Sequence, residues 1–174
     1  VDAAVAAAFV LHAVEPHLNG PGGDLVGIVA PAGGAPFVLC GQGPAPAAAT
    51  IDRFRATGLD TVPGSGALAA AVPGAVAALL HLLAEHGTWE LPDVLQHAVD
   101  LLEHGHPASP QLSRVIDTMA DRFRADWPTS AAAWLPRGRA PEPGEQVRNP
   151  AYAATLRRLA DTARGTTRAD RVRA

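Results

Sequence analysis

Seven histidines are the residues that first suggest chemistry in this sequence. His104 and His106 flank Gly105, a spacing that zinc sites use, but no cluster of Cys, Asp or Glu stands beside them. His81 and His86 are five positions apart, which turns them away from a common helical face. We therefore expect surface or helix-capping roles, with no metal site and no cofactor. The full set is His12, His17, His81, His86, His97, His104 and His106.

Three short patterns could hold a nucleophile or an anion. Gly64-Ser65-Gly66 resembles half of a nucleophile elbow. The G-x-S-x-G motif, however, needs one further residue between the serine and each glycine, and a strand before it. The run Gly20-Pro21-Gly22-Gly23 precedes a predicted strand instead of opening a helix, so no helix N-terminus would face a phosphate. Cys40 lies in an apolar run without an adjacent base, and we expect an inert core residue.

The composition excludes several classes of protein. A chain of 174 residues can form one domain, and 48% apolar with 18% charged residues is ordinary for a globular fold. A net charge of -3 gives no basic field for nucleic acid, and one cysteine excludes an internal disulfide framework. The longest apolar stretch, Ala3 to Val14, is too short to span a bilayer. We expect no nucleic-acid or membrane partner, and the compartment stays open with the cytoplasm as the default.

The first half of the chain predicts a buried helix followed by two buried strands. Asp2 to Val14 is apolar on almost every side, so this helix should be covered on almost every side. Leu25 to Ala30 and Pro36 to Cys40 read as strands joined by a PAGGA turn, both covered on two faces. The loop Glu15 to Asp24 should be buried. Its glycines Gly20, Gly22 and Gly23 should serve close backbone approach, with one or more at positive φ.

The second half predicts mainly helices. We expect a short helix from Thr50 to Gly58, a brief strand at Leu68 to Val72, and a charged tail over 162–174 without a partner face. Two or three strands without neighbours leave exposed edges, so the fold reads as unfinished. The longer predicted helices cover about 75–86, 91–103, 110–124 (capped by Ser109) and 150–161, with a proline-rich loop at 128–143.

Four segments, in order, resemble the gamma-glutamyltransferase family. They are VDAAVAAAFVLHAVEPHLNGPGGDL, GQGPAPAAAT, ALAAAVPGAVAALLHLLAEHGTWELPDVLQHAVDLLEHGHPASPQL and NPAYAATLRRLAD, and together they cover nearly the whole chain. The resemblance implies an α/β fold, the four-layer α/β/β/α sandwich of the Ntn hydrolases. It identifies residues 1–174 as an incomplete, helix-rich part of the large subunit, truncated at both ends.

The resemblance also implies an enzyme in its full-length form. The family precursor cuts itself, and the new N-terminal threonine of the small subunit attacks an amide while its own α-amine acts as base. Thr166 and Thr167 lack the TTHxSVVD-like surroundings of that nucleophile, so this chain should hold no catalytic residue and be inactive alone. The implied partners are the rest of the large subunit, the small subunit and a small-molecule amide substrate. The alternative is a non-catalytic scaffold or binding protein with the same large-subunit fold.

One departure from the family bears on the substrate. Transpeptidases typically carry Asp-Gly-Arg-Glu-Thr-Ala-Pro where this chain has Cys40 to Pro46, and their arginine clamps the substrate α-carboxylate. Here Gln42 and Gly43 replace that arginine and the following glutamate, and losing a charge-assisted pair costs about 1.5–3 kcal/mol. The pattern resembles the branch that includes oxamate amidohydrolase. We expect Gln42 and Gly43 to line the substrate pocket; alternatively, Gln42 is a plain loop residue and another arginine clamps the substrate.

Overall fold

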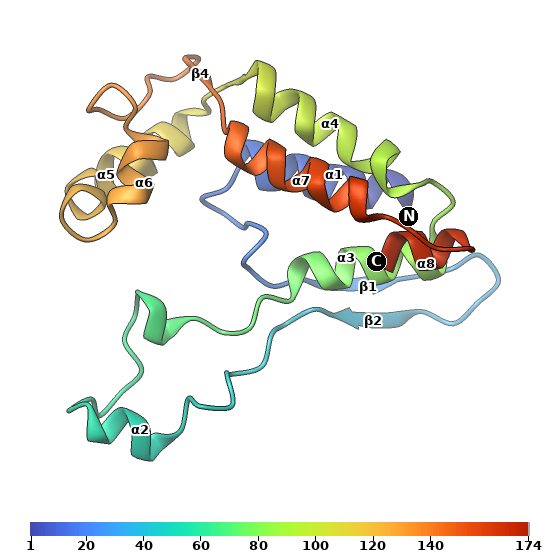
Figure 1. Cartoon of the computed structure of the whole chain (residues 1–174), viewed down its shortest axis with the longest axis horizontal. Helices are drawn as coiled ribbons and strands as arrows, with labels where there is room; N and C mark the ends of the chain where they lie inside the picture. The colour runs from blue at the N-terminus through green and yellow to red at the C-terminus, as the bar shows by residue number, and fades with distance from the viewer. Residues whose placement is uncertain (174) are drawn as a thin grey trace. The chain divides into compact units, whose positions relative to one another are not determined.

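The computed structural model describes residues 1–173, which divide into two compact units (Figure 1). The helical unit comprises residues 1–20 and 79–173, and the hairpin unit comprises residues 21–78. The boundary falls within helix α3 (Ala75–His86). In sequence, the hairpin unit is therefore an insertion between two parts of the helical unit.

Three helices form the centre of the helical unit. Helix α4 (Leu91–His104) packs against both α1 (Asp2–Val14) and α7 (Pro150–Thr162), and Figure 1 shows the three helices gathered together. Only one face of α1 is covered: Phe9 is fully buried, whereas Leu11 is 54% exposed. The prediction of burial on almost every side is thus wrong for the described chain, because α4 covers a single face. The largest fully buried side chains of the unit are Phe9, Leu83, Leu91, Leu95, Leu102, Leu112, Val5, Val94 and Val172.

Capping residues explain where the later helices begin. The Ser109 hydroxyl accepts a hydrogen bond from the Leu112 N–H at the start of α5 (Pro110–Asp126), as the sequence predicts. Asn149 caps α7 in the same way. The expected proline-rich loop instead contains helix α6 (Pro128–Trp134), because its proline occupies the first turn, where the missing N–H costs nothing. Strand β3 (His106–Pro107), which lies between α4 and α5, pairs antiparallel with β4 (Gln146–Val147), which lies just before α7.

The charged tail has a partner face, contrary to expectation. It forms helix α8 (Arg168–Arg173), in which Val172 is 1% exposed. The Arg168 guanidinium donates to the carbonyl oxygens of Leu83 and Ala84 at distances of 3.0 and 2.7 Å. These carbonyls lie in the last turn of α3, where helices leave acceptors without an intrahelical partner; the Leu83 oxygen also accepts from the Gly87 N–H at 2.9 Å. Arg168 thus caps a helix that is distant in sequence, a role that a sequence pattern does not reveal.

The hairpin unit contains a single two-stranded ladder among the described residues. Strands β1 (Val26–Val29) and β2 (Phe37–Cys40) are antiparallel, and Gly33 takes a φ of 73° in the turn between them. Helix α2 (Ile51–Ala56) follows within the predicted range from Thr50 to Gly58, and the Thr50 side chain caps it. The predicted strand near Leu68 is wrong: a 3₁₀ turn, η1 (Ala67–Ala69), is found there because no neighbouring strand of the described chain pairs with it.

The expected burial of both strands is also wrong for this chain. Val26, Ile28 and Val38 are 62%, 79% and 65% exposed, and Leu39 alone is buried in the ladder. Cys40, expected in the core, is exposed because its neighbour Leu39 takes the inward position and adjacent strand residues face opposite sides. Among the described residues, no helix combines the length and apolar character needed to cross a bilayer.

Candidate functional site

Backbone segments from three parts of the hairpin unit cross at one place. Leu25 and Gly41 exchange two hydrogen bonds, with N···O distances of 3.3 and 2.6 Å, which extend the hairpin by one pair. The Val72 N–H donates to the Pro44 carbonyl oxygen at 3.0 Å. The Gly23 carbonyl oxygen accepts from the N–H groups at the start of α3 at 3.1 and 3.2 Å. These bonds hold residues 22–25, 41–44 and 72–75 against one another.

The crossing requires glycine at three positions. A Cβ atom on Gly43 would lie 1.4 Å from the Val72 carbonyl oxygen, and one on Gly74 would lie 2.1 Å from the Gly41 carbonyl oxygen. A Cβ atom on Gly41 would lie 2.5 Å from the Ala78 side chain. Real contacts are never this short, so any side chain here would force the backbone segments apart. Position 43 cannot take the glutamate of the transpeptidases unless the segment around Val72 moves.

The glycine loop differs from its prediction. None of Gly20, Gly22 and Gly23 has a positive φ, and a Cβ atom added to Gly20 or Gly22 would have no neighbour within 4 Å. Gly22 is exposed to solvent. The expected burial of this loop is therefore wrong for the described chain. Local sequence shows that a glycine allows close approach, but the partner segment decides which glycine needs it. Here the partner segments are distant in sequence, and their backbones lie close to Gly41, Gly43 and Gly74 instead of Gly20 and Gly22.

An open cavity of about 450 Å³ lies over the crossing. Of the five residues that the sequence analysis proposes for the pocket and its glycine loop, Gly22, Gly23, Gln42 and Gly43 line this cavity, and Gly20 does not. Gln42 lies at this cavity, and Asp24 is the only ionisable residue of the described lining. An amide and an open backbone can hydrogen-bond a neutral polar group, but the lining offers no cation for a carboxylate. The lining residues are Gly22, Gly23, Asp24, Gln42, Gly43, Ala71 and Val72.

The histidines do not converge on a metal site. His104 fits the expectation of a surface role, since it is exposed, and its Nδ1 lies 3.0 Å from the Asp100 carbonyl oxygen one turn earlier in α4. His12 and His106 are 5% and 4% exposed, so the expectation of surface or capping roles is wrong for them. Burial lowers the pKa of His12, because the imidazolium loses solvation. Within residues 1–173, no group of three or more His, Cys, Asp or Glu side chains could hold a metal ion.

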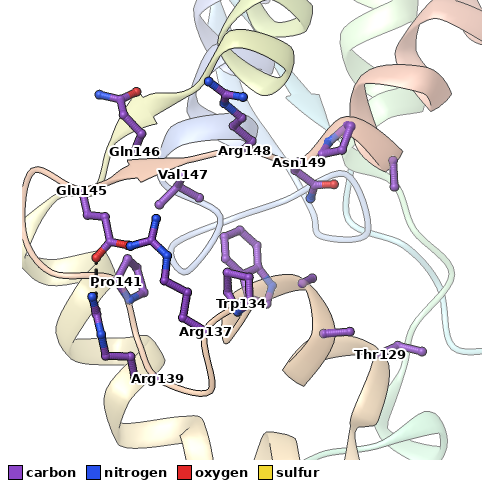
Figure 2. A pocket seen from close by; sticks show the side chains of 15 residues that line it. Thr129, Trp134, Arg137, Arg139, Pro141, Glu145, Gln146, Val147, Arg148 and Asn149 are labelled. Atoms are coloured by element: carbon purple, nitrogen blue, oxygen red, sulfur yellow. Dashed lines mark hydrogen bonds and ion pairs between the residues drawn. The ribbon is translucent and has the colours of Figure 1, made fainter.

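A second cavity, of about 760 Å³, lies in the helical unit between α6, β4 and the start of α7 (Figure 2). The Glu145 carboxylate on its wall accepts hydrogen bonds from the Glu142 N–H, Arg139 and Arg137. These donors, the Glu142 N–H first, hold the pKa of Glu145 below its usual range. No sequence pattern marks this cavity, because much of its lining falls in the segment that the sequence predicts to be a proline-rich loop.

Comparison with known proteins identifies the family. The family model for gamma-glutamyltranspeptidase matches residues 1–167. The chain belongs to the gamma-glutamyltranspeptidase family. The resemblance drawn from the four sequence segments is thereby confirmed, and so is the fold class, because structures of this family and of its acylase members superimpose on the chain.

Three similar proteins show what share of a family member's length this chain covers. The Acylase ACY 1 proenzyme of Pseudomonas sp. (strain V22) is 36% identical over 92% of this chain and 30% of its own length. The Oxamate amidohydrolase proenzyme of Klebsiella pneumoniae is 32% identical over 92% of this chain and 31% of its own length. The solved structure of LmbA2991HD is 53% identical with a TM-score of 0.94, over 98% of this chain and 30% of that one. The chain thus spans about three tenths of the length of these relatives.

Proposed function

We propose that this chain is the part of an N-terminal-threonine amidohydrolase or acyltransferase that shapes the acyl-binding pocket. The reaction would pass through a threonyl ester, with the nucleophile in a part of the protein outside residues 1–174. Family membership supports this assignment, and the similar proteins named as proenzymes support a precursor that is cut into subunits. The partners would be the rest of the large subunit and the small subunit.

Thr166 and Thr167 have a structural role, which supports a nucleophile located elsewhere in the protein. The Thr167 hydroxyl and the Asp170 carboxylate each bond to the other's backbone N–H, at 3.1 and 3.2 Å, which forms a capping box at the start of α8. The Thr166 hydroxyl lies 3.4 Å from the same carboxylate. In this structure the hydroxyl and the N–H of Thr167 are both engaged in the helix cap, and a threonine inside a continuous chain has no free α-amine to act as its base. Neither residue is suited to attack an amide.

The observation that carries the proposed substrate class is the lining of the cavity over the crossing. Gln42 stands where transpeptidases carry the clamping arginine, and the other lining residues supply no positive charge. A donor with a free α-carboxylate would leave water and find Asp24 as the only ionisable group among the described lining residues. Unpaired charge is costly to bury. We therefore propose a small or neutral acyl amide as substrate, with Gln42 and Gly43 contacting the acyl portion.

The test uses the complete protein encoded by the gene that carries this sequence. The processed enzyme is assayed with γ-glutamyl-p-nitroanilide and with oxamate, before and after Gln42→Arg. We expect oxamate or a similar small amide to be the better substrate of the unaltered enzyme. The substitution should raise kcat/KM for the γ-glutamyl donor about 10- to 100-fold, mainly through KM, because it restores a charge-assisted pair. Gln111→Arg adds the same charge to the exposed surface of α5 and serves as the matched control.

Two results would contradict the proposal at different levels. Efficient turnover of the γ-glutamyl donor by the unaltered enzyme would overturn the substrate class and show that another residue supplies the positive charge. Failure of the complete protein to process itself or to form an acyl-enzyme, measured by intact mass spectrometry, would favour the non-catalytic scaffold instead.

A further inference from the structure

The wall of the cavity in the helical unit is held in place by one carboxylate. Glu145 is 20% exposed and pairs with both Arg137 and Arg139, and Figure 2 shows these three side chains converging between the loop and β4. The Glu142 N–H adds a third bond to the same carboxylate at 3.0 Å. The two guanidinium groups are therefore positioned before any ligand arrives, which lowers the entropic cost of binding.

The two arginines keep most of their hydrogen-bonding capacity. Each guanidinium has five N–H donors, yet the hydrogen bonds that Arg137 and Arg139 make within residues 1–173 all come from a single terminal nitrogen, Nη1. Their side chains are 66% and 48% exposed, so the remaining donors are accessible. The two guanidinium groups face the Glu145 carboxylate and, 3.8 Å from Arg139, the Glu142 carboxylate, and Arg148 adds a third positive charge to the lining. The cavity therefore carries an excess of positive charge.

Helix α7 adds to the positive potential. Pro150 and Ala151, its first two residues, line the cavity. Pro150 has no N–H and the Tyr152 N–H already donates to the Asn149 side chain, so the helix contributes through its dipole and not through these two groups. The N-terminus of a helix carries partial positive charge that attracts anions. This contribution is independent of the arginines, since it comes from the backbone of a different element.

The rest of the lining is largely apolar. Trp134 and Val147 lie toward the middle of the cavity in Figure 2, and alanine and proline side chains make up most of the other walls. A volume of about 760 Å³ falls within the roughly 300–1,000 Å³ typical of small-molecule sites. Apolar walls beside fixed cations suit a molecule that has an apolar body and an acidic group.

We propose that this cavity binds a small organic anion, a carboxylic acid joined to an apolar body, at a site separate in composition from the Gln42 cavity. Arg137 and Arg139 pair with the carboxylate, and the side of the cavity around Trp134 and Val147 takes the apolar body. This site goes beyond the proposed acyl-transfer function, because none of its lining residues belongs to the cavity over the glycine crossing.

The test measures binding of three probes of one shape and different charge to the complete protein. The probes are 1-naphthaleneacetate, the neutral 1-naphthaleneacetamide and 1-naphthylmethylammonium, titrated by calorimetry. We expect saturable binding of the acid, at least tenfold weaker binding of the amide, and none of the ammonium. Arg137→Gln should weaken binding of the acid about 10- to 100-fold and leave the amide unchanged, because it removes a charge-assisted pair. Arg137→Lys, which keeps the charge, should weaken the acid less than Arg137→Gln.

Arg158→Gln is the matched control, since Arg158 is an exposed arginine of α7 that does not line the cavity. It should leave all three affinities unchanged. Equal affinities for the acid and the amide would overturn the proposal, as would equal effects of the two glutamine variants. Failure of the acid to saturate at millimolar concentration would show that this cavity is no binding site in the complete protein.

Discussion

The helical unit buries many of its large apolar side chains, whereas the hairpin unit leaves most of its own exposed. In the hairpin unit the buried apolar residues are Leu39, Ala75 and Ala78, and all others in the buried core of residues 1–173 belong to the helical unit. The large apolar residues that stay exposed are concentrated in the hairpin unit: Val26, Ile28, Phe37, Val38, Ile51, Val62, Leu68 and Val72. An apolar residue type alone therefore does not show whether the side chain is buried within the described chain or exposed on its surface.

The largest expected effect concerns the exposed hairpin. The 174-residue chain expressed alone should self-associate, because Ile28 and Val38 are opposite each other in the ladder and both face water. The paired change Ile28→Glu with Val38→Lys places opposite charges across the strands and should yield a monomer. Size-exclusion chromatography with light scattering measures the difference. A monodisperse monomer formed by the unaltered chain would contradict this prediction.

The next effect lies in the helical core. In the charged double variant, Leu95→Ala should lower the free energy of unfolding by about 2–5 kcal/mol, because it empties a fully buried site on α4. Leu18→Ala removes the same atoms from a side chain that is 68% exposed and should change that free energy by less than about 0.5 kcal/mol. Urea unfolding followed by helical circular dichroism gives both values. Similar losses in the two variants would show that the helical unit has no core of its own.

A smaller effect is expected where the hairpin unit is most tightly built. Gly43→Ala should destabilise the complete protein by about 1–3 kcal/mol, because its methyl group would displace the Val72 carbonyl. Gly64→Ala, at a position with open space and no positive φ, should be nearly neutral. Hydrogen exchange of residues 41–44 and 72–75 reports the loss directly. Unchanged protection in the Gly43 variant would disprove the requirement for glycine at the crossing.

The smallest effect concerns a surface ion pair in the helical unit. Arg157 donates two hydrogen bonds to Glu103, which lowers the pKa of that carboxyl. A carboxyl with a depressed folded-state pKa stabilises the protein above its unfolded-state pKa, and this contribution disappears as the pH falls through the folded value. In the charged double variant, Glu103→Gln should therefore slightly reduce the urea midpoint at pH 7, and the difference from the double variant itself should vanish at acidic pH. A difference that persists there would assign the effect to packing.

Elements that depend on local rules were predictable from the sequence, and those that depend on distant partners were not. Ser109 and Thr50 mark the starts of helices, because capping involves residues three positions apart. The glycines of the crossing and the docking of α8 depend on segments that meet only in the folded chain. For the candidate site, sequence singled out Gln42 and Gly43 through a family pattern. The cavity beside Trp134 has no such pattern and emerged only from the structure.

The insertion of the hairpin unit has a consequence for synthesis. Helix α1 packs on α4, and about 90 residues separate the end of α1 at Val14 from the end of α4 at His104. Translation adds roughly 5–20 residues per second, so the apolar face of α1 waits about 5–20 seconds after it is made before its partner exists. During that interval the α4 side of the core that covers Phe9 in this structure has not yet been made. A chaperone that recognises short apolar helices on the ribosome therefore has a defined target and a defined time in which to bind it.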